Sequence, residues 1–324
     1  MAIAMTGQQK DDLERKGYFV VENLLSADET AAVSAAMDQV AAEVRAERGL
    51  GPGDKVALRN GMIRHPKLLD LMDHPAILEL VVDAYGWNIH NRDSVTQCEP
   101  PRPDGSDPDV LSLGWHFDYE EEFCGTTVDG TLPLLDFKVG WYISDHTEPG
   151  HSTILVVPGS YRWSREQRAT FEEWLDPADI VAVKVPAGSV MLWRPTLLHS
   201  VTPNLSQTER KAIYVSYTPR WVRPSGHLEQ DAGLIARSSP VRRQLLGAMG
   251  NLGHPLGSDP VNNPSSQYWF SDDWDTVPLK AWAEERAGGP PYDWGTGLGV
   301  SHTKGPNFAF TQVTIPDGPS EGSS

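Results

Sequence analysis

Three histidines in the chain stand two residues before an acidic residue, a spacing that can serve metal binding. The pairs are His116–Asp118, His146–Glu148 and His227–Glu229. Side chains at positions i and i+2 of a β-strand point to the same face, so such a pair on a strand can bind one metal ion together. With a second imidazole from a neighbouring strand, the pair would complete the two-histidine, one-carboxylate arrangement that suits non-haem Fe(II) chemistry.

The three pairs differ in their surroundings. His116 and Asp118 lie in the apolar and aromatic run from Leu111 to Tyr119, which reads as a strand, whereas the other two pairs lie in polar segments rich in Pro, Gly and Ser. We therefore favour the first pair as metal ligands. A single H-x-D is a weak motif, and a surface histidine beside an ordinary acid is the alternative.

Two later residues could complete the site. His199 ends an apolar run that follows the turn at Pro186–Gly188, and Arg210 comes eleven residues further on, at the start of another strand-like run. A guanidinium can hold a carboxylate with two hydrogen bonds, so Arg210 is a candidate anchor for a dicarboxylate. Taken singly, His199 could be an ordinary core-edge histidine and Arg210 a solvated charge.

The pattern of apolar residues predicts the elements that would hold these side chains. A strand at 17–21 is followed by helices at 27–48 and 66–85, where apolar residues recur at helical spacing. From about residue 89 short β-rich runs alternate with turn signals, which is typical of a sandwich or barrel of antiparallel strands. These runs cover residues 93–98, 111–119, 137–144, 152–157, 180–185, 189–193, 197–201 and 211–218.

Composition excludes several classes of function. The chain has 324 residues and a formal net charge of −17, which disfavours nucleic-acid and anionic-membrane partners. No apolar run is long enough for a membrane span, and the N-terminus lacks the features of a signal peptide, so we expect a cytoplasmic protein. The two cysteines, Cys98 and Cys124, read as free thiols.

The chain reads as a single domain over residues 1–324. We expect an N-terminal strand and helices over 10–88 and a β core over about 89–220. An irregular segment, a wrap or a lid over the core, would follow at 221–315, and a disordered tail at 316–324.

These residues together resemble the phytanoyl-CoA dioxygenase-like family of Fe(II)/2-oxoglutarate-dependent oxygenases. The opening segment 16–28 is similar to the family's N-terminal strand and helix, and the run from Val156 to Arg162 is similar to its V-I-P-G-S-H-R segment. The metal pair, the distal histidine and the later arginine follow in the family's order. Tyr161 replaces the histidine of that segment, and the loop after Cys98 is unusual, so substrate identity does not carry over.

The resemblance implies a mainly β fold with flanking helices: a double-stranded β-helix, or cupin-like jelly roll, buttressed by N-terminal helices. It implies that His116, Asp118 and His199 bind Fe(II), and that Arg210 binds the far carboxylate of 2-oxoglutarate, with O2 as the second co-substrate. Gln97 and Thr153 are further candidates for co-substrate contacts, or else ordinary polar residues on strand faces. Aromatic residues that could line a substrate pocket, or simply pack in the core, are Trp115, Tyr119, Trp141 and Trp193.

We therefore expect a dioxygenase that hydroxylates or otherwise oxidises an unactivated C–H bond of a small molecule, with natural-product biosynthesis as one setting. The carboxylate at Asp118 argues against halogenation, because halogenases of this superfamily carry a small residue there. A non-catalytic jelly-roll binding protein and a metal-dependent hydrolase are the alternatives. Arg59, Arg64 and Arg92 could meet an anionic substrate, although salt bridges to nearby acids are the simpler reading. The expected assembly is a monomer or homodimer.

Overall fold

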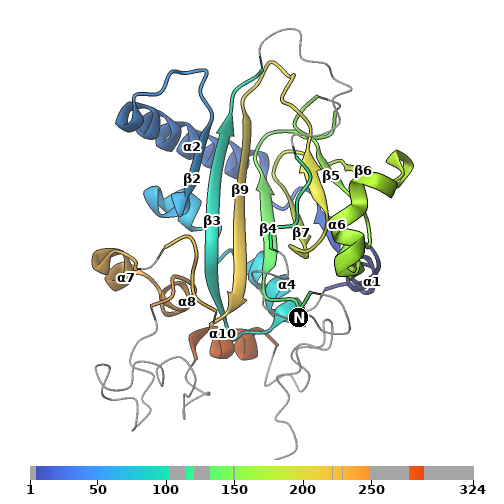
Figure 1. The fold of residues 1–324 in the computed structure, drawn as a ribbon. Coiled ribbons are helices and arrows are strands. Elements are labelled where there is room, and N and C mark those ends of the chain that lie inside the picture. Colours follow the sequence, from blue (N-terminus) through green and yellow to red (C-terminus); the bar gives the residue numbers. More distant parts are fainter. Residues whose placement is uncertain are drawn as a thin grey trace, which may run out of the picture.

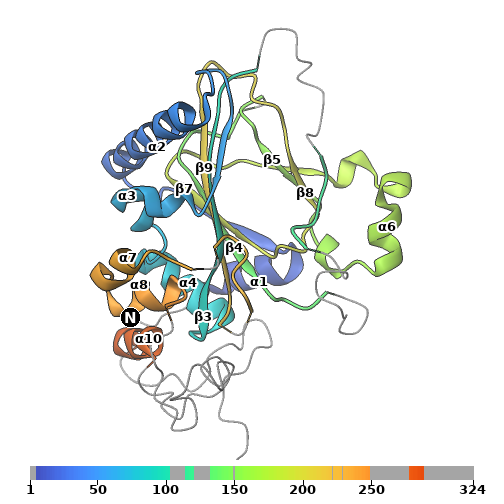
Figure 2. The same ribbon diagram turned by 60° about the vertical axis from the view of Figure 1, so that its left-hand side comes forward.

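The chain folds into two antiparallel β-sheets that face each other, with helices outside both (Figures 1 and 2). The structure is a computed structural model, and it describes residues 5–102, 114–119, 132–148, 150–220, 222–227, 229–248 and 277–287. This arrangement confirms the predicted jelly roll with flanking helices.

The larger sheet has six strands in the order β1-β7-β4-β9-β3-β2. Apart from β2 and β3, neighbours in this order are not consecutive strands of the chain, as the crossovers of a jelly roll require. The strands are β1 (Tyr18–Val21), β2 (Val56–Arg59), β3 (Ile89–Glu99), β4 (Phe137–Tyr142), β7 (Ser189–Trp193) and β9 (Arg210–Pro219).

The smaller sheet has the order β6-β5-β8, with strands β5 (Ile154–Val156), β6 (Val181–Val183) and β8 (His199–Val201). A backbone bridge between His116 and His199 adds the segment around His116 to its edge beyond β8. Of the strand predicted at 111–119, the described residues 114–119 form only this bridge. Residues 111–113 lie outside the described residues.

Helices cover the outer face of the larger sheet, as Figure 2 shows. The apolar faces of α2 and α4 pack on this sheet together with residues of the shorter helices. Ser26 begins α2 with a reciprocal capping box to Glu29, and Gly49 ends it in the left-handed conformation. The helices of this layer are α2 (Ala27–Arg48), α3 (Pro66–Leu69), α4 (Pro75–Tyr85), α7 (Ala232–Arg237), α8 (Pro240–Leu245) and α10 (Pro278–Ala287).

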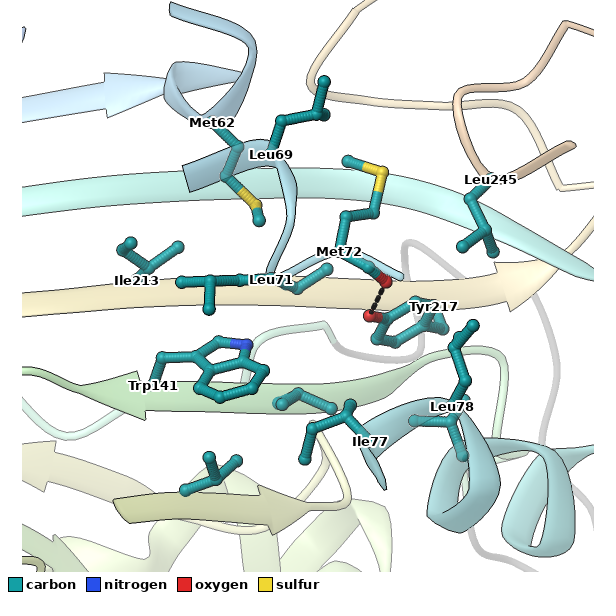
Figure 3. Packing of buried hydrophobic residues seen from close by; sticks show 14 of the residues in the cluster. Met62, Leu69, Leu71, Met72, Ile77, Leu78, Trp141, Ile213, Tyr217 and Leu245 are labelled. Atoms are coloured by element: carbon teal, nitrogen blue, oxygen red, sulfur yellow. Dashed lines mark hydrogen bonds between the residues drawn. The ribbon is translucent and has the colours of Figure 1, made fainter. Parts of the chain in front are cut away.

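Figure 3 shows the centre of this helix-facing core. Trp141 and Tyr217 project from β4 and β9 among Met72, Ile77 and other aliphatic side chains, and all of them are almost completely buried. The hydroxyl of Tyr217 donates a hydrogen bond to the carbonyl of Met72 at 2.6 Å, which ties the sheet to the chain between α3 and α4.

Two further helices pack elsewhere. Helix α1 (Gly7–Arg15) precedes β1, and α6 (Arg165–Trp174) lies outside the smaller sheet, where Phe171 contacts a small cluster around Phe117 and Leu198. Single turns of 3-10 helix lie at Gly61–Arg64, Ser160–Arg162 and Pro177–Asp179. Among the described residues, no helix combines the length and the apolar character that crossing a bilayer demands.

Two expectations from the sequence were wrong in detail. The single helix expected over 66–85 is two helices, because the chain breaks after Leu69 and restarts with Pro75 at the first helical position, where a missing N–H costs nothing. The segment after Arg220 is not wholly irregular, since its described residues include α7, α8 and α10. The expected disordered tail at 316–324 lies outside the described residues.

Candidate metal centre

Three potential metal ligands meet at the inner face of the smaller sheet. One ligand atom from each of His116, Asp118 and His199 lies within 4.8 Å of the others. The two histidines are direct partners across antiparallel strands, joined by reciprocal backbone hydrogen bonds of 3.0 and 3.1 Å. Direct partners point to the same face, as do residues i and i+2, so the pairing places all three side chains together.

Backbone carbonyls orient both imidazoles. Nδ1 of His116 lies 3.1 Å from the carbonyl oxygen of Gly114, and Nδ1 of His199 lies 2.8 Å from that of Leu197. A carbonyl can only accept, so each Nδ1 carries the proton and each neutral ring keeps Nε2 as a lone-pair donor. Metal-binding histidines are commonly held by such contacts.

The two oxygens of the Asp118 carboxylate have different surroundings. Oδ1 accepts a hydrogen bond from Lys138, whereas Oδ2 is buried without a hydrogen-bond partner among the described residues and lies 3.7 Å from Nε2 of His199. An unpaired buried carboxylate oxygen is costly unless a donor or a metal ion meets it. Two Nε2 atoms and this oxygen form the donor set of a 2-His-1-carboxylate site, so the residues fit Fe(II).

The electrostatics keep Asp118 and His199 in the protonation states that metal binding requires at neutral pH. Burial alone would raise the pKa of Asp118, but the charges of Lys138 and the two histidines outweigh burial and lower it to about 2. Burial lowers the pKa of His199 to about 4, against the opposing pull of Asp118. The carboxylate is therefore ionised and His199 is neutral, as metal binding requires.

Arg210 marks the opposite end of the same cavity. Its guanidinium is buried and donates to Oε1 of Gln97 at 2.7 Å and to the hydroxyl of Tyr214 at 2.6 Å, while its Nε has no partner among the described residues. Oε2 of Glu99 lies 3.8 Å from Arg210 but only 2.8 Å from the ammonium of Lys55. Arg210 thus keeps a donor for an anion that enters the cavity.

A cavity of about 600 Å³ joins the two ends. This volume is in the range of small-molecule sites. Residues of the larger sheet form one wall, and His116, Asp118 and the β8 residues form the other. The lining includes Lys55, Arg59, Arg92, Asp93, Val95, Gln97, His116, Asp118, Lys138, Ile154, Trp193, His199, Arg210, Tyr214 and Ser216.

The structure places some of the predicted co-substrate and pocket residues at the cavity and others away from it. Gln97 and Trp193 line the cavity as expected. Thr153 does not line it, because its hydroxyl donates instead to the carbonyls of His146 and Glu148 at 3.4 and 3.1 Å.

The other three aromatic residues do not line the cavity either. Trp141 lies on the opposite face of the larger sheet, in edge-to-face contact with His74. Trp115 packs against the cluster beneath α6. Tyr119 is tied by its hydroxyl to the backbone of Pro133 and Leu135. The expectation that these three shape the pocket is not supported by the described lining.

Arg59, Arg64 and Arg92 all form salt bridges, and two of them also line the cavity. Arg59 and Arg92 line the cavity and also form ion pairs, with Asp93 and Asp136 respectively. Arg64 lies away from the cavity and pairs with Glu43 and Glu47 on α2.

Among the cavity residues not predicted from the sequence, two contact predicted site residues directly. Lys138 contacts Asp118, and Tyr214 contacts Arg210. A signal for Tyr214 was present, because it lies four residues after Arg210 in a strand and so shares its face. For Lys138 the strand was predicted, but nothing in the sequence alone says which of its faces looks inward.

Comparisons with known proteins agree with this geometry. The sequence model of the family described as "Phytanoyl-CoA dioxygenase (PhyH)" matches residues 13–212. An uncharacterised protein of Mycobacterium tuberculosis is 26% identical over 248 residues, covering 74% of this chain and 86% of its own. A probable alpha-ketoglutarate-dependent hypophosphite dioxygenase of Stutzerimonas stutzeri is 25% identical over 241 residues, covering 65% and 77%.

Solved structures share the fold. The non-heme alpha ketoglutarate dependent carbocyclase SnoK from nogalamycin biosynthesis superposes with a TM-score of 0.52 at 22% identity, covering 74% of this chain and 93% of its own. HygX from Streptomyces hygroscopicus, with nickel and 2-oxoglutarate bound, gives 0.52 at 16% identity, covering 73% and 95%. Since the family model spans well over half of the chain, this protein belongs to the phytanoyl-CoA dioxygenase family and is a non-haem Fe(II)/2-oxoglutarate-dependent dioxygenase.

Proposed function

We propose that this protein oxidises an unactivated C–H bond of a small polar molecule. The observation that carries the proposal is the convergence of His116, Asp118 and His199 at one end of a cavity whose other end is Arg210. A metal ligand set and a buried cation in one cavity suit a dicarboxylate co-substrate that reaches from the metal to the guanidinium.

Each of the site residues has a role that follows from its contacts. The two Nε2 atoms and Oδ2 of Asp118 would hold the iron and leave its remaining positions open. Arg210, fixed by Gln97 and Tyr214, would bind the far carboxylate of 2-oxoglutarate. Iron and 2-oxoglutarate, when bound, supply the oxidising chemistry with O2, while the two sheets position the substrate and limit the access of water.

The polar lining supports a small, polar substrate. The described lining includes the charged and polar residues Arg59, Arg92, Asp93 and Ser216, beside the aliphatic residues Val95, Ile154 and Val201. Two curated relatives are named for small polar molecules, a hypophosphite dioxygenase and an ectoine dioxygenase of Bordetella parapertussis. SnoK is described as a carbocyclase from nogalamycin biosynthesis, which supports a role in tailoring a natural product.

The presence of Asp118 supports hydroxylation or a related oxidation. A carboxylate bound to iron occupies the position that a halide would need, so we do not expect chlorination. Ring closure, desaturation or epimerisation would use the same ligands, because these outcomes differ in how the substrate is placed.

Succinate release tests the proposal directly. Purified protein is supplied under air with Fe(II), 2-oxoglutarate and a panel of candidate polar substrates, and succinate and oxidised product are quantified. We expect turnover that needs Fe(II) and 2-oxoglutarate and that vanishes in Asp118→Ala but survives in Asp179→Ala, an exposed acid outside the cavity.

Three results would contradict it. Turnover of 2-oxoglutarate by Asp118→Ala at the wild-type rate would exclude the assigned metal ligands. Hydrolysis of a substrate without O2 or 2-oxoglutarate would point instead to a metal-dependent hydrolase, and specific ligand binding without any turnover would point to a binding protein.

A further inference from the structure

Lys138 lines the cavity beside the candidate metal ligands. It projects from the inner face of β4, directly opposite Trp193 of β7 and Ser216 of β9. Its ammonium lies 5.7 Å from the centre of the Trp193 ring and 6.0 Å from that of Tyr214, and the side chain is 17% exposed. A lysine so enclosed needs an anionic partner.

That partner is a metal ligand. Among the described residues, Asp118 is the one carboxylate that forms an ion pair with Lys138, through Oδ1. Oδ2 remains for the metal, so a bound divalent ion and the ammonium of Lys138 would share one carboxylate. Two cations held by one carboxylate repel each other strongly where water is excluded.

The same ammonium lies near the path to Arg210. The ring of Tyr214 is beside Lys138, and the hydroxyl of Tyr214 accepts a hydrogen bond from Arg210. A dicarboxylate that extends from the metal to Arg210 would therefore lie between the positive charges of Lys138 and Arg210. Its negative charge would be attracted by Lys138, whereas the metal is repelled.

We propose that Lys138 couples the two binding events, weakening metal binding at Asp118 and strengthening the binding of 2-oxoglutarate to the metal-loaded protein. The inference rests on the proposed function, since it concerns the same metal and co-substrate. It gives Lys138 a positioning role through electrostatics. A residue that merely supported the fold would shift both affinities in the same direction.

Binding measurements without turnover test the coupling. Mn(II) affinity of the metal-free protein and 2-oxoglutarate affinity of the Mn(II)-loaded protein are measured by anaerobic titration calorimetry. For Lys138→Met and Lys138→Gln we expect Mn(II) to bind at least ~10-fold tighter and 2-oxoglutarate at least ~10-fold weaker, within the usual range of coupling between sites. Lys138→Gln can keep a hydrogen bond to Asp118 without the charge.

Two controls complete the design. Lys138→Arg keeps the positive charge, so both affinities should stay close to those of the wild type. Lys184→Met removes an exposed lysine outside the cavity and should change neither affinity. Thermal melting of each variant, with and without Mn(II), identifies any protein that has failed to fold. If Lys138→Met does not fold, Lys138→Gln decides.

Affinities that fall together, or that stay within about twofold of the wild type in both neutral variants, would overturn the coupling. Failure of the proposed function would look different, because the wild-type protein would then bind neither Mn(II) through Asp118 nor 2-oxoglutarate. Asp118→Ala, which should lose Mn(II) binding, identifies that case.

Discussion

One face of the larger sheet packs in the apolar core beneath the helices, and the other lines the cavity with its charged residues, although the same strands form both faces. On β4, Phe137, Val139 and Trp141 enter the helix-covered core, while Lys138 and Tyr142 face the smaller sheet. On β9, Tyr217 points outward and Arg210 inward. Moving one residue along a strand exchanges a core side chain for a cavity side chain.

The difference separates what holds the fold together from what binds ligands. The outer face buries large aliphatic and aromatic side chains, which stabilise the folded state. The inner face holds charges such as Lys138, which pairs with Asp118 of the facing wall, and Arg210; these charges are costly to bury and are retained with their partners. Changes on the outer face should therefore act on stability, and changes on the inner face on binding and on pH dependence.

The largest effect on stability should come from Trp141 on the outer face. Trp141→Ala should lower the free energy of unfolding by about 3–5 kcal/mol, because it leaves a cavity in a fully buried cluster. Urea unfolding measures this loss. The folded fraction should bind Mn(II) as the wild type does; a loss of metal affinity at unchanged stability would contradict the separation of the two faces.

Acid should destabilise the protein through its buried histidines. Burial lowers the pKa of His90 to about 4 and that of His146 to about 3. In the metal-free protein burial also lowers the pKa of His199, to about 4. Between pH 6.5 and these values the unfolded chain binds protons that the folded chain does not, so stability falls as pH falls. Burial raises the pKa of Asp136 to about 6, which opposes the trend below pH 6.

Three histidines against one carboxylate leave a net loss of at least about 2 kcal/mol between pH 7 and pH 5. Urea unfolding of the metal-free protein at several pH values measures the slope. Equal or greater stability at pH 5 would show that these histidines are protonated in the folded state.

Arg210→Lys tests the inner face with a conservative change. A lysine keeps the charge but not the paired donors of the guanidinium, so the affinity for 2-oxoglutarate should fall about 10-fold or more, or about 1.4 kcal/mol. Calorimetry on the Mn(II)-loaded protein gives this value. Metal affinity should be unchanged, and a matching fall in metal affinity would mean that Arg210 supports the fold of the metal centre instead.

The smallest effect should come from Tyr217→Phe on the outer face. It removes one buried hydrogen bond to Met72 without changing the shape of the core, so the free energy of unfolding should fall by about 1 kcal/mol (Figure 3). A hydrogen-exchange comparison should place the loss near α3 and α4. An effect on 2-oxoglutarate affinity as large as that of Arg210→Lys would break the distinction between the faces.

The clustering of the three candidate metal ligands could be predicted from the sequence, because their spacing on strands and their order along the chain carry the information. The faces of the strands were harder to assign. On β4, Phe137, Val139 and Trp141 alternate with Lys138, Gly140 and Tyr142. Aromatic residues stand in both sets, so the sequence alone does not say which set faces the cavity.

Some signals were present but not used. Ser164 and Gln167 form a capping box that begins α6, and the same pattern at Thr6 begins α1. The short strand β2 shows no such local signal, and its residues are held by pairing with β3, which lies beyond α3 and α4 in the chain. Tertiary pairing, rather than local preference, decides elements of this length.

The backbone bridge between His116 and His199 also has a thermodynamic consequence. Because each residue donates its N–H to the carbonyl of the other, and each ring is held by a carbonyl two residues before it, the imidazoles lose their freedom when the chain folds. Little conformational entropy then remains to be lost when the ion arrives. Metal capture by these two strands should therefore carry a small ordering penalty, and the heat of binding should report mainly the exchange of water for protein ligands.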